Sequence, residues 1–161
     1  MQQTGHPLGG DSADELVDAV MAASRALLAV VARSLASVDE DVTLPQYRAL
    51  VVLGQHGTQR PVDLATALDV SPSTATRMCD RLVAKGLVDR DRVGDDRREV
   101  RVRLSDRGRA LVDEVTRRRR AELAVLLAAL PAERQEAVVA ALRSFADAAG
   151  EVPEREWAVG P

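Results

Sequence analysis

The sequence predicts a mainly α-helical fold that carries one small β-hairpin. Of its 161 residues 46% are apolar but only 2% are aromatic, so Leu, Val and Ala must build the core. Ala and Leu are strong helix formers. Six segments carry helical start signals or apolar residues at helical spacing. Between the fourth and the fifth of them, the chain changes to the two-residue period that is typical of strands.

The first predicted helix is long. Ser12-Ala13-Asp14-Glu15 has the form of a capping box, so we expect the helix to begin there and to end near Val38. The apolar residues that recur along it at helical spacing are Leu16, Val20, Leu27, Val31 and Leu35. They predict one continuous apolar stripe.

Three shorter helices are predicted next. Thr43-Leu44-Pro45-Gln46 is a second capping box with proline in the first turn, and its helix should end near residues 54–57. A short helix follows Pro61 and ends near Leu68. Ser71-Pro72 pairs an N-cap residue with proline at the first helical position, and Gly86 suits a left-handed C-terminus. The fourth helix should therefore end at about Lys85.

A hairpin is predicted after Gly86. Residues 87–92 and 99–104 are short extended segments, and Gly94-Asp95-Asp96 supplies a turn between them. In the second segment Val100, Val102 and Leu104 alternate with arginines, which indicates a strand with one buried face.

Two helices follow the hairpin. Ser105 can cap a long helix that reaches about Leu130, and Pro131 opens a sixth helix that ends at Gly150. The sixth helix places Val138, Ala141, Leu142 and Phe145 on one face. Both helices are therefore expected to be amphipathic.

The second to fourth helices and the hairpin have the order of a winged helix-turn-helix. At about 100° per residue, the fourth helix divides into two faces. The small-polar and basic face is centred on Arg77 and also holds Ser73, Thr74, Asp80, Arg81 and Ala84; the apolar face holds Ala75, Met78, Cys79, Leu82 and Val83. Small hydroxyls at a helix N-terminus and arginines one turn apart suit contact with phosphates and base edges.

The charge distribution favours the same segment. The formal net charge of the chain is −3, but residues 71–103 hold nine basic and six acidic side chains and are its only positive third. An electrostatic footprint for nucleic acid requires a basic patch rather than a basic protein.

The sequence from about residue 16 to residue 149 resembles the multiple-antibiotic-resistance regulator (MarR) family. The resemblance rests on Leu64-Ala65 and Leu68-Asp69-Val70-Ser71 before the fourth helix, on residues 81–88 at its end, and on Asp96-Arg97-Arg98, residues 100–104, Ser105 and Gly108. It implies a transcription regulator that binds DNA.

Seven residues are expected to contact DNA: Ser71, Ser73, Thr74, Arg77, Arg81, Arg97 and Arg98. The last two lie at the tip of the wing, where an arginine can enter a narrow minor groove. The resemblance implies that Arg98 is this minor-groove arginine and that Asp96 holds it. Without the resemblance, an Asp-Arg cluster at a turn would be interpreted as a solvated loop.

The first, fifth and sixth helices are left over once the DNA-binding core is built. Their apolar faces need a partner surface, so we expect a twofold homodimer, which the resemblance also implies. The expected division is a disordered tail at 1–11, an N-terminal dimerisation helix at 12–42, the winged helix-turn-helix at 43–104, C-terminal dimerisation helices at 105–150 and a disordered tail at 151–161.

The resemblance further implies a small amphipathic or phenolic effector that binds between the dimer helices and the DNA-binding core. The ligand-binding residues themselves stay unknown. Tyr47 is the only aromatic residue near that region, and we expect it to be a core tyrosine with its hydroxyl at the surface.

Two other features have plainer interpretations. Cys79 lies on the apolar face of the fourth helix with no second cysteine in the chain, so we interpret it as a core residue rather than a redox sensor. The run from Arg117 to Arg120 lies along a helix, where Glu114 and Glu122 are each four residues from Arg118 and can pair with it. We interpret this run as a solvated helix face.

The sequence thus predicts a ligand-responsive repressor that binds a pseudo-palindromic operator as a homodimer. It shows no secretory signal, no bilayer-spanning segment, no metal-ligand spacing and no catalytic constellation, so we expect a cytoplasmic protein that is not an enzyme and uses no cofactor. The alternative is a winged-helix protein-interaction module. The arginines of the fourth helix and wing speak against it, because an interaction surface would be more apolar.

Overall fold

The computed structural model describes residues 10–92 and 100–151. The elements are α1 (Gly10–Ala36), α2 (Leu44–His56), α3 (Pro61–Leu68), α4 (Pro72–Ala84), β1 (Val88–Arg92), β2 (Val100–Leu104), α5 (Asp106–Leu127) and α6 (Ala132–Ala148). The fold is therefore mainly helical with one small antiparallel hairpin, as the sequence predicts. No helix among the described residues is both long and apolar enough to span a membrane.

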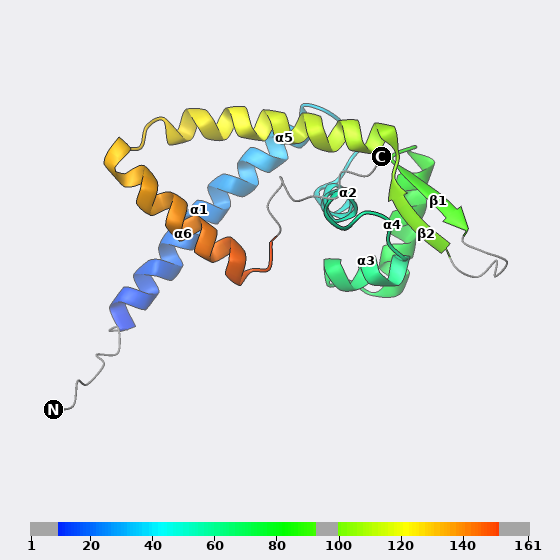
Figure 1. Ribbon diagram of the computed structural model, residues 1–161, viewed down its shortest axis with the longest axis horizontal. Helices are drawn as coiled ribbons and strands as arrows, with labels where there is room; N and C mark the ends of the chain where they lie inside the picture. The colour runs from blue at the N-terminus through cyan, green and yellow to red at the C-terminus, as the bar shows by residue number, and fades with distance from the viewer. Residues whose placement is uncertain (1–9, 93–99, 152–161) are drawn as a thin grey trace.

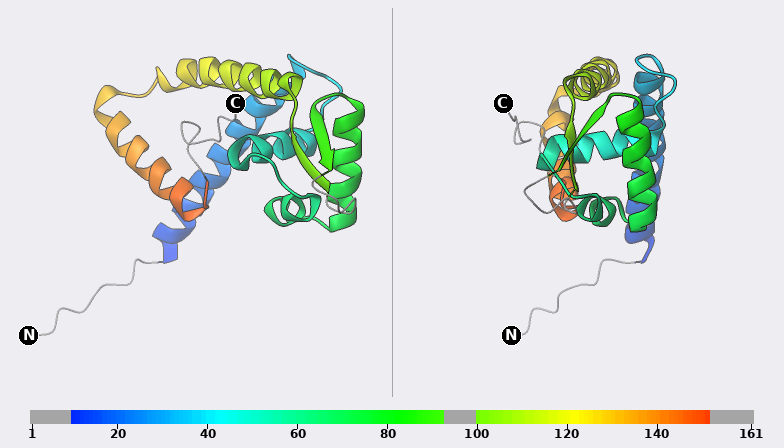
Figure 2. Two further views of the ribbon diagram at one scale, coloured as in Figure 1. Left: turned by 45° about the vertical axis from the view of Figure 1, so that its right-hand side comes forward. Right: turned by 90° about the vertical axis from the view of Figure 1, so that its right-hand side faces the viewer.

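The molecule has a compact lobe at one end and an extended arm at the other (Figure 1). In the lobe, α2, α3, α4 and the hairpin gather around the beginning of α5. In the arm, α1 rises to meet α5, and α6 turns back from the far end of α5. The left view of Figure 2 shows the same separation between α6 and the hairpin.

Three of the predicted helix caps are confirmed. The hydroxyl of Thr43 accepts the backbone N–H of Gln46, and the side chain of Gln46 accepts the backbone N–H of Thr43, which completes a capping box. Ser71 accepts the N–H of Thr74 at the start of α4, and Ser105 accepts the N–H of Gly108 at the start of α5. These bonds satisfy N–H groups that have no partner inside the helix.

Two predicted helix ends are wrong by a few residues. The first helix already includes Gly10, so Ser12 lies inside it and is not its N-cap. At the other end α5 stops at Leu127 instead of near Leu130, because the N–H groups of Ala129 and Leu130 bond to carbonyls three residues back. That tighter turn brings the chain round to Pro131 and α6.

The turn between α3 and α4 fixes the angle of α4. Asp69 ends α3 in the left-handed conformation, with φ of 53°, and its N–H bonds to the carbonyl of Thr66. Aspartate tolerates this conformation better than most residues. At the end of α4, Gly86 has φ of 67°, which agrees with its predicted role.

The hairpin is anchored on both sides of β2. β1 pairs with β2 in a register that joins Val88 to Leu104 and Arg92 to Val100. On the opposite edge, Gln59 exchanges two backbone hydrogen bonds with Val102, of 2.7 and 2.9 Å. Val102 and Leu104 are buried as the alternation predicts, and the predicted turn residues 94–96 lie outside the described residues.

The core lies in the lobe. It is formed by Leu50 and Leu53 of α2, Leu82 of α4, Val102 of β2 and Val115 of α5, together with their neighbours. By contrast, α6 buries none of its residues. The large apolar side chains exposed on the arm are Leu16, Val17, Met21, Leu27, Leu28, Val125, Leu126, Leu127, Val139, Leu142 and Phe145. The monomer thus leaves the apolar faces of its arm uncovered.

Tyr47 differs from its prediction. It is a core residue, but its hydroxyl is buried and has no hydrogen-bond partner in the described part of the chain. The hydroxyl was expected at the surface. The helix that carries it, α2, contacts α1, α3 and α5.

Candidate nucleic-acid interface

The α4 helix presents one polar face to solvent. Ala75, Cys79 and Leu82 are completely buried against the core, whereas Ser73, Arg77 and Arg81 are exposed. Packing against α3 and β1 holds the helix in place. The division of α4 into two faces is therefore as the sequence predicts.

Hydroxyl groups cluster at the N-terminus of α4. The Ser71 hydroxyl lies 3.0 Å from that of Ser73 and 2.9 Å from that of Thr74, while it caps the helix. Ser71 and Ser73 are exposed and Thr74 is half-buried. Small hydroxyl side chains let a ligand backbone approach the positive end of the helix dipole closely.

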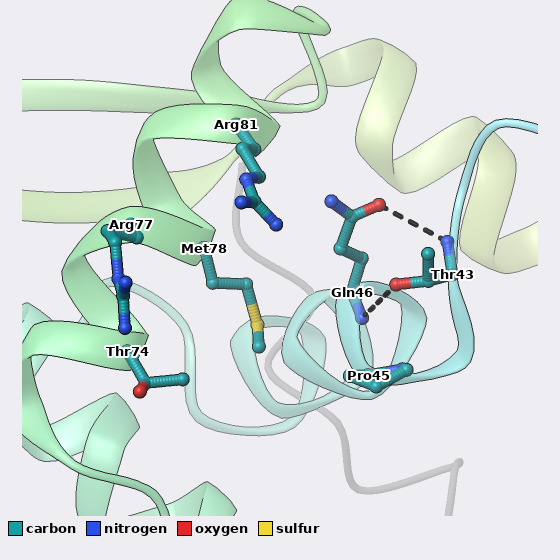
Figure 3. A pocket seen from close by; sticks show the side chains of 7 residues that line it. All are labelled: Thr43, Pro45, Gln46, Thr74, Arg77, Met78 and Arg81. Atoms are coloured by element: carbon teal, nitrogen blue, oxygen red, sulfur yellow. Dashed lines mark hydrogen bonds between the residues drawn. The ribbon is translucent and has the colours of Figure 1, made fainter.

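Arg77 and Arg81 border a cleft of about 320 Å³ between α4 and the beginning of α2. Thr43, which caps α2, and Pro45 and Gln46 in the first turn of α2 form its other wall (Figure 3). Neither guanidinium has an ion-pair partner among the residues of 10–92 and 100–151. Two unpaired cations on an exposed helix face are suited to bind an anionic polymer.

Asp80 on the same face of α4 is held in an ion pair, unlike Arg77 and Arg81. Its carboxylate pairs with the guanidinium of Arg90 on β1. This pair neutralises the charge of Asp80 and ties β1 to α4. The sequence did not identify Arg90, because nothing in a separation of ten residues indicates that the two side chains meet.

The arginines of β2 are only partly available to a ligand. Arg103 lies 3.0 Å from Asp89 and 2.9 Å from Asp91, and the hydrogen bond that its guanidinium donates to Asp91 is the main reason that the pKa of Arg103 is raised. Its charge is already balanced by β1. The predicted wing residues Asp96, Arg97 and Arg98 lie outside the described residues.

Cys79 is buried in the apolar face of α4. Desolvation by burial raises the pKa of its thiol, which keeps it in the unreactive protonated form. This geometry agrees with the interpretation of Cys79 as a core residue.

Two arginines of α5, Arg117 and Arg118, are engaged by hydrogen bonds and ion pairs. Glu114 pairs with both Arg117 and Arg118, whose hydrogen bonds lower the pKa of Glu114. Arg118 also donates to the carbonyl of Ser37 at 3.2 Å. Glu122 pairs with Arg33 of α1, so its predicted pairing with Arg118 is wrong. Glu122 instead joins the two long helices.

The chain has well-defined relatives. The model of the MarR family matches residues 42–100. The HTH-type transcriptional repressor MdtR of Bacillus subtilis is 33% identical over 124 residues, which cover 76% of this chain and 80% of MdtR. The HTH-type regulator YfiV of the same organism is 32% identical over 98 residues, and the match spans 61% of its length.

Solved structures match the chain over a longer part of its length than these two relatives do. The crystal structure of RV1404 from Mycobacterium tuberculosis matches with a TM-score of 0.82 and 42% identity. That match covers 90% of this chain and 99% of RV1404. It includes the arm as well as the lobe.

Proposed function

Because the chain belongs to the MarR family, we propose that it regulates transcription by binding duplex DNA as a homodimer. The observation that carries the proposal is the exposed face of α4, where Arg77 and Arg81 have no partner among the described residues. A helix of this kind fits the major groove, with its N-terminal residues at the base edges. Ser71, Ser73 and Thr74 occupy those N-terminal positions.

The wing supplies the second contact. We propose that Arg97 and Arg98 reach the minor groove beside the half-site and that Asp96 supports Arg98. The support for this step is the hairpin itself, which is fixed to α4 through Arg90 and to the loop before α3 through Gln59. An anchored strand pair can hold a wing tip at a constant distance from α4.

The arm supplies the dimer. The exposed apolar side chains of α1, α5 and α6 form the surface that we assign to the second copy. A concave apolar site of about 330 Å³ between the end of α5 and α6, lined by Leu127, Val139 and Leu142, is suited to receive a side chain of the partner. A dimer brings two α4 helices to one duplex, so the operator should be a pseudo-palindrome.

We further propose that an amphipathic or phenolic effector controls DNA binding and that the protein is a repressor. Ser34 of α1, Tyr47 of α2 and Thr116 of α5 each bury a hydroxyl that has no partner in the described part. These three helices pack against one another where the arm meets the lobe. Repression is the activity named for MdtR. DNA binding would place the protein in the cytoplasm.

The test is duplex binding at several salt concentrations. Fluorescence anisotropy with a 30-base-pair duplex of mixed sequence should show binding that falls by about 10³–10⁵ between 50 and 200 mM salt if six to ten phosphates are contacted. Replacing both exposed arginines of α4, in an Arg77→Ala, Arg81→Ala double variant, should weaken it. A protein-interaction module would show no binding, or binding that does not change with salt.

A further inference from the structure

Gln46 is a buried side chain with half of its amide unused. It is 6% exposed, and its Oε1 accepts hydrogen bonds from the N–H of Thr43 at 3.2 Å and from the Nζ of Lys85 at 3.3 Å. Two donors at Oε1 fix the orientation of the amide. Its Nε2 has no hydrogen-bond partner in the part of the chain that the structure describes.

The unused amide group faces the cleft between α2 and α4. Gln46, Arg77 and Arg81 all line that cleft, and in Figure 3 the nitrogen of the Gln46 amide lies on the side of Arg81, while its oxygen lies on the side of Thr43. This N–H₂ group is not among the buried polar atoms that lack a partner in the described residues, so it is open to the cleft and available to a ligand. The neighbouring guanidinium makes an anion the suitable acceptor.

We propose that Gln46 and Arg81 together hold one backbone phosphate of the bound duplex. The inference rests on the proposed function and adds a DNA contact on α2 to those on α4. The phosphate oxygens accept from the Nε2 of Gln46 and from the guanidinium of Arg81. This contact sets the depth at which α4 enters the groove, because α2 and α4 would grip the same strand.

The arrangement also separates the roles of the two arginines. Arg81 lies one turn further from the N-terminus of α4 than Arg77, and it lies beside Gln46 in the cleft. Arg81 is thus a phosphate ligand, and its removal should weaken binding to every sequence alike. Arg77 stays available for base edges.

The decisive variant is Gln46→Glu. Glutamate serves the capping box as well as glutamine, so the fold is kept, but the N–H₂ donor becomes a carboxylate oxygen that repels phosphate. We expect the affinity for a 30-base-pair mixed-sequence duplex to fall about tenfold or more per protomer. Log affinity decreases with log salt, and the magnitude of this slope should become smaller by about 0.9 per protomer.

Gln55→Glu near the C-terminal end of α2 is the matched control, since it makes the same charge change on the same helix, outside the cleft and outside the apolar faces of the arm. It should bind like the wild type. Arg81→Gln is a second test variant, because it leaves the Thr43–Gln46 capping box intact. Arg81 is exposed and has no partner in the described part of the chain. This variant should also weaken mixed-sequence binding and reduce the magnitude of the slope.

The outcomes separate the two hypotheses. Wild-type protein that does not bind any duplex would refute the proposed function. Wild-type protein that binds while Gln46→Glu matches Gln55→Glu would overturn the phosphate site alone, as would an Arg81→Gln variant with unchanged affinity and slope. Thermal unfolding of each variant checks that the fold is intact.

Discussion

At the scale of single residues, burial distinguishes a core role of Cys79 from a redox-sensing role. The thiol lies inside the apolar face of α4, and its pKa is raised by desolvation. Both features could be inferred from its place among Ala75, Met78 and Leu82 in the helical period. Residue identity and spacing were sufficient here because burial depends mainly on the periodicity of one helix.

Cys79→Ser should destabilise the fold and leave the response to peroxide unchanged. The hydroxyl would be buried in an apolar site, at a cost of roughly 1–3 kcal/mol. Urea unfolding of both proteins measures the loss. If mild peroxide released DNA from the wild type but not from the serine variant, the core interpretation would be wrong.

Gly108 is required by a close approach between chain segments. A Cβ built at this position would lie 2.0 Å from the carbonyl oxygen of Leu87, which is backbone and cannot move aside cheaply. Gly108→Ala should therefore cost about 1–3 kcal/mol or more of the free energy of unfolding. An unchanged urea midpoint would show that α5 can shift away from β1 without loss.

Long-range side-chain pairs could not be predicted from the sequence. Glu122 was expected to pair with Arg118 within α5, but it pairs with Arg33 on α1, and Asp80 pairs with Arg90 on β1. Helical spacing identifies candidates on one helix only. Which partner is chosen depends on how two elements pack, and that information is absent from local spacing.

At the scale of elements, helix and strand types were predictable because several local signals agree. The capping bonds at Thr43, Ser71 and Ser105 have the geometry that their sequence motifs indicate. The start of α1 was not predictable in the same way, because Ser12-Ala13-Asp14-Glu15 competes with helix formation by Gly10 and Asp11 just before it. The Ser12-Ala13-Asp14-Glu15 motif is present in the sequence, but it lies inside α1 and does not mark the start of the helix.

The capping box at Thr43 locates a helix start whether its fourth residue is glutamine or glutamate. Glutamine differs from glutamate in this position by one N–H₂ donor group, which the cap does not need. That difference is visible in the sequence. The cleft that the donor faces is not, because it depends on the packing of α2 beside α4.

One ion pair links the end of α6 to the lobe and should depend on pH. Glu151 accepts from Arg48 at 2.8 Å, and this hydrogen bond is the main reason that the pKa of Glu151 is lowered. A lowered pKa in the folded state stabilises the fold above the usual pKa of glutamate, and this contribution is lost as the pH falls through the folded-state value.

Glu151→Gln should therefore cost under about 1 kcal/mol at pH 7, since both partners are partly exposed. The difference from the wild type should vanish in acid, below the folded-state pKa. Urea unfolding at pH 7 and near pH 3 measures it, with Glu136→Gln on the exposed side of α6 as the control. A difference that persisted in acid would contradict an ionic origin.

At the scale of the whole molecule, the arm does not cover its own apolar faces. α6 buries nothing, and large apolar residues stay exposed along α1, α5 and α6. The sequence indicated these uncovered faces, because the first, fifth and sixth predicted helices carry apolar stripes that are not needed to build the DNA-binding core. The symmetry axis of the proposed dimer could not be predicted from the sequence, because the positions of apolar stripes do not specify how two copies cross.

Light scattering should give about twice the monomer mass of 17.3 kDa. Leu142→Arg should shift the protein toward monomers, because it places a charge in the apolar arm without disturbing a buried contact of the monomer. Val62→Arg, at a similarly exposed position on α3, should leave the mass unchanged. A wild-type protein with the monomer mass would contradict the dimer.

Footprinting of a bound duplex tests most directly whether a dimer presents two α4 helices to DNA. Duplexes would be selected from a random library by the wild-type protein and then cleaved with hydroxyl radical in its presence. We expect inverted repeats whose centres lie on the order of 10 base pairs apart, with protection extending outward on both sides where the wings lie. Arg77→Ala should relax the sequence preference within the repeats. A single asymmetric site without an inverted repeat, or an unchanged preference in Arg77→Ala, would contradict the model.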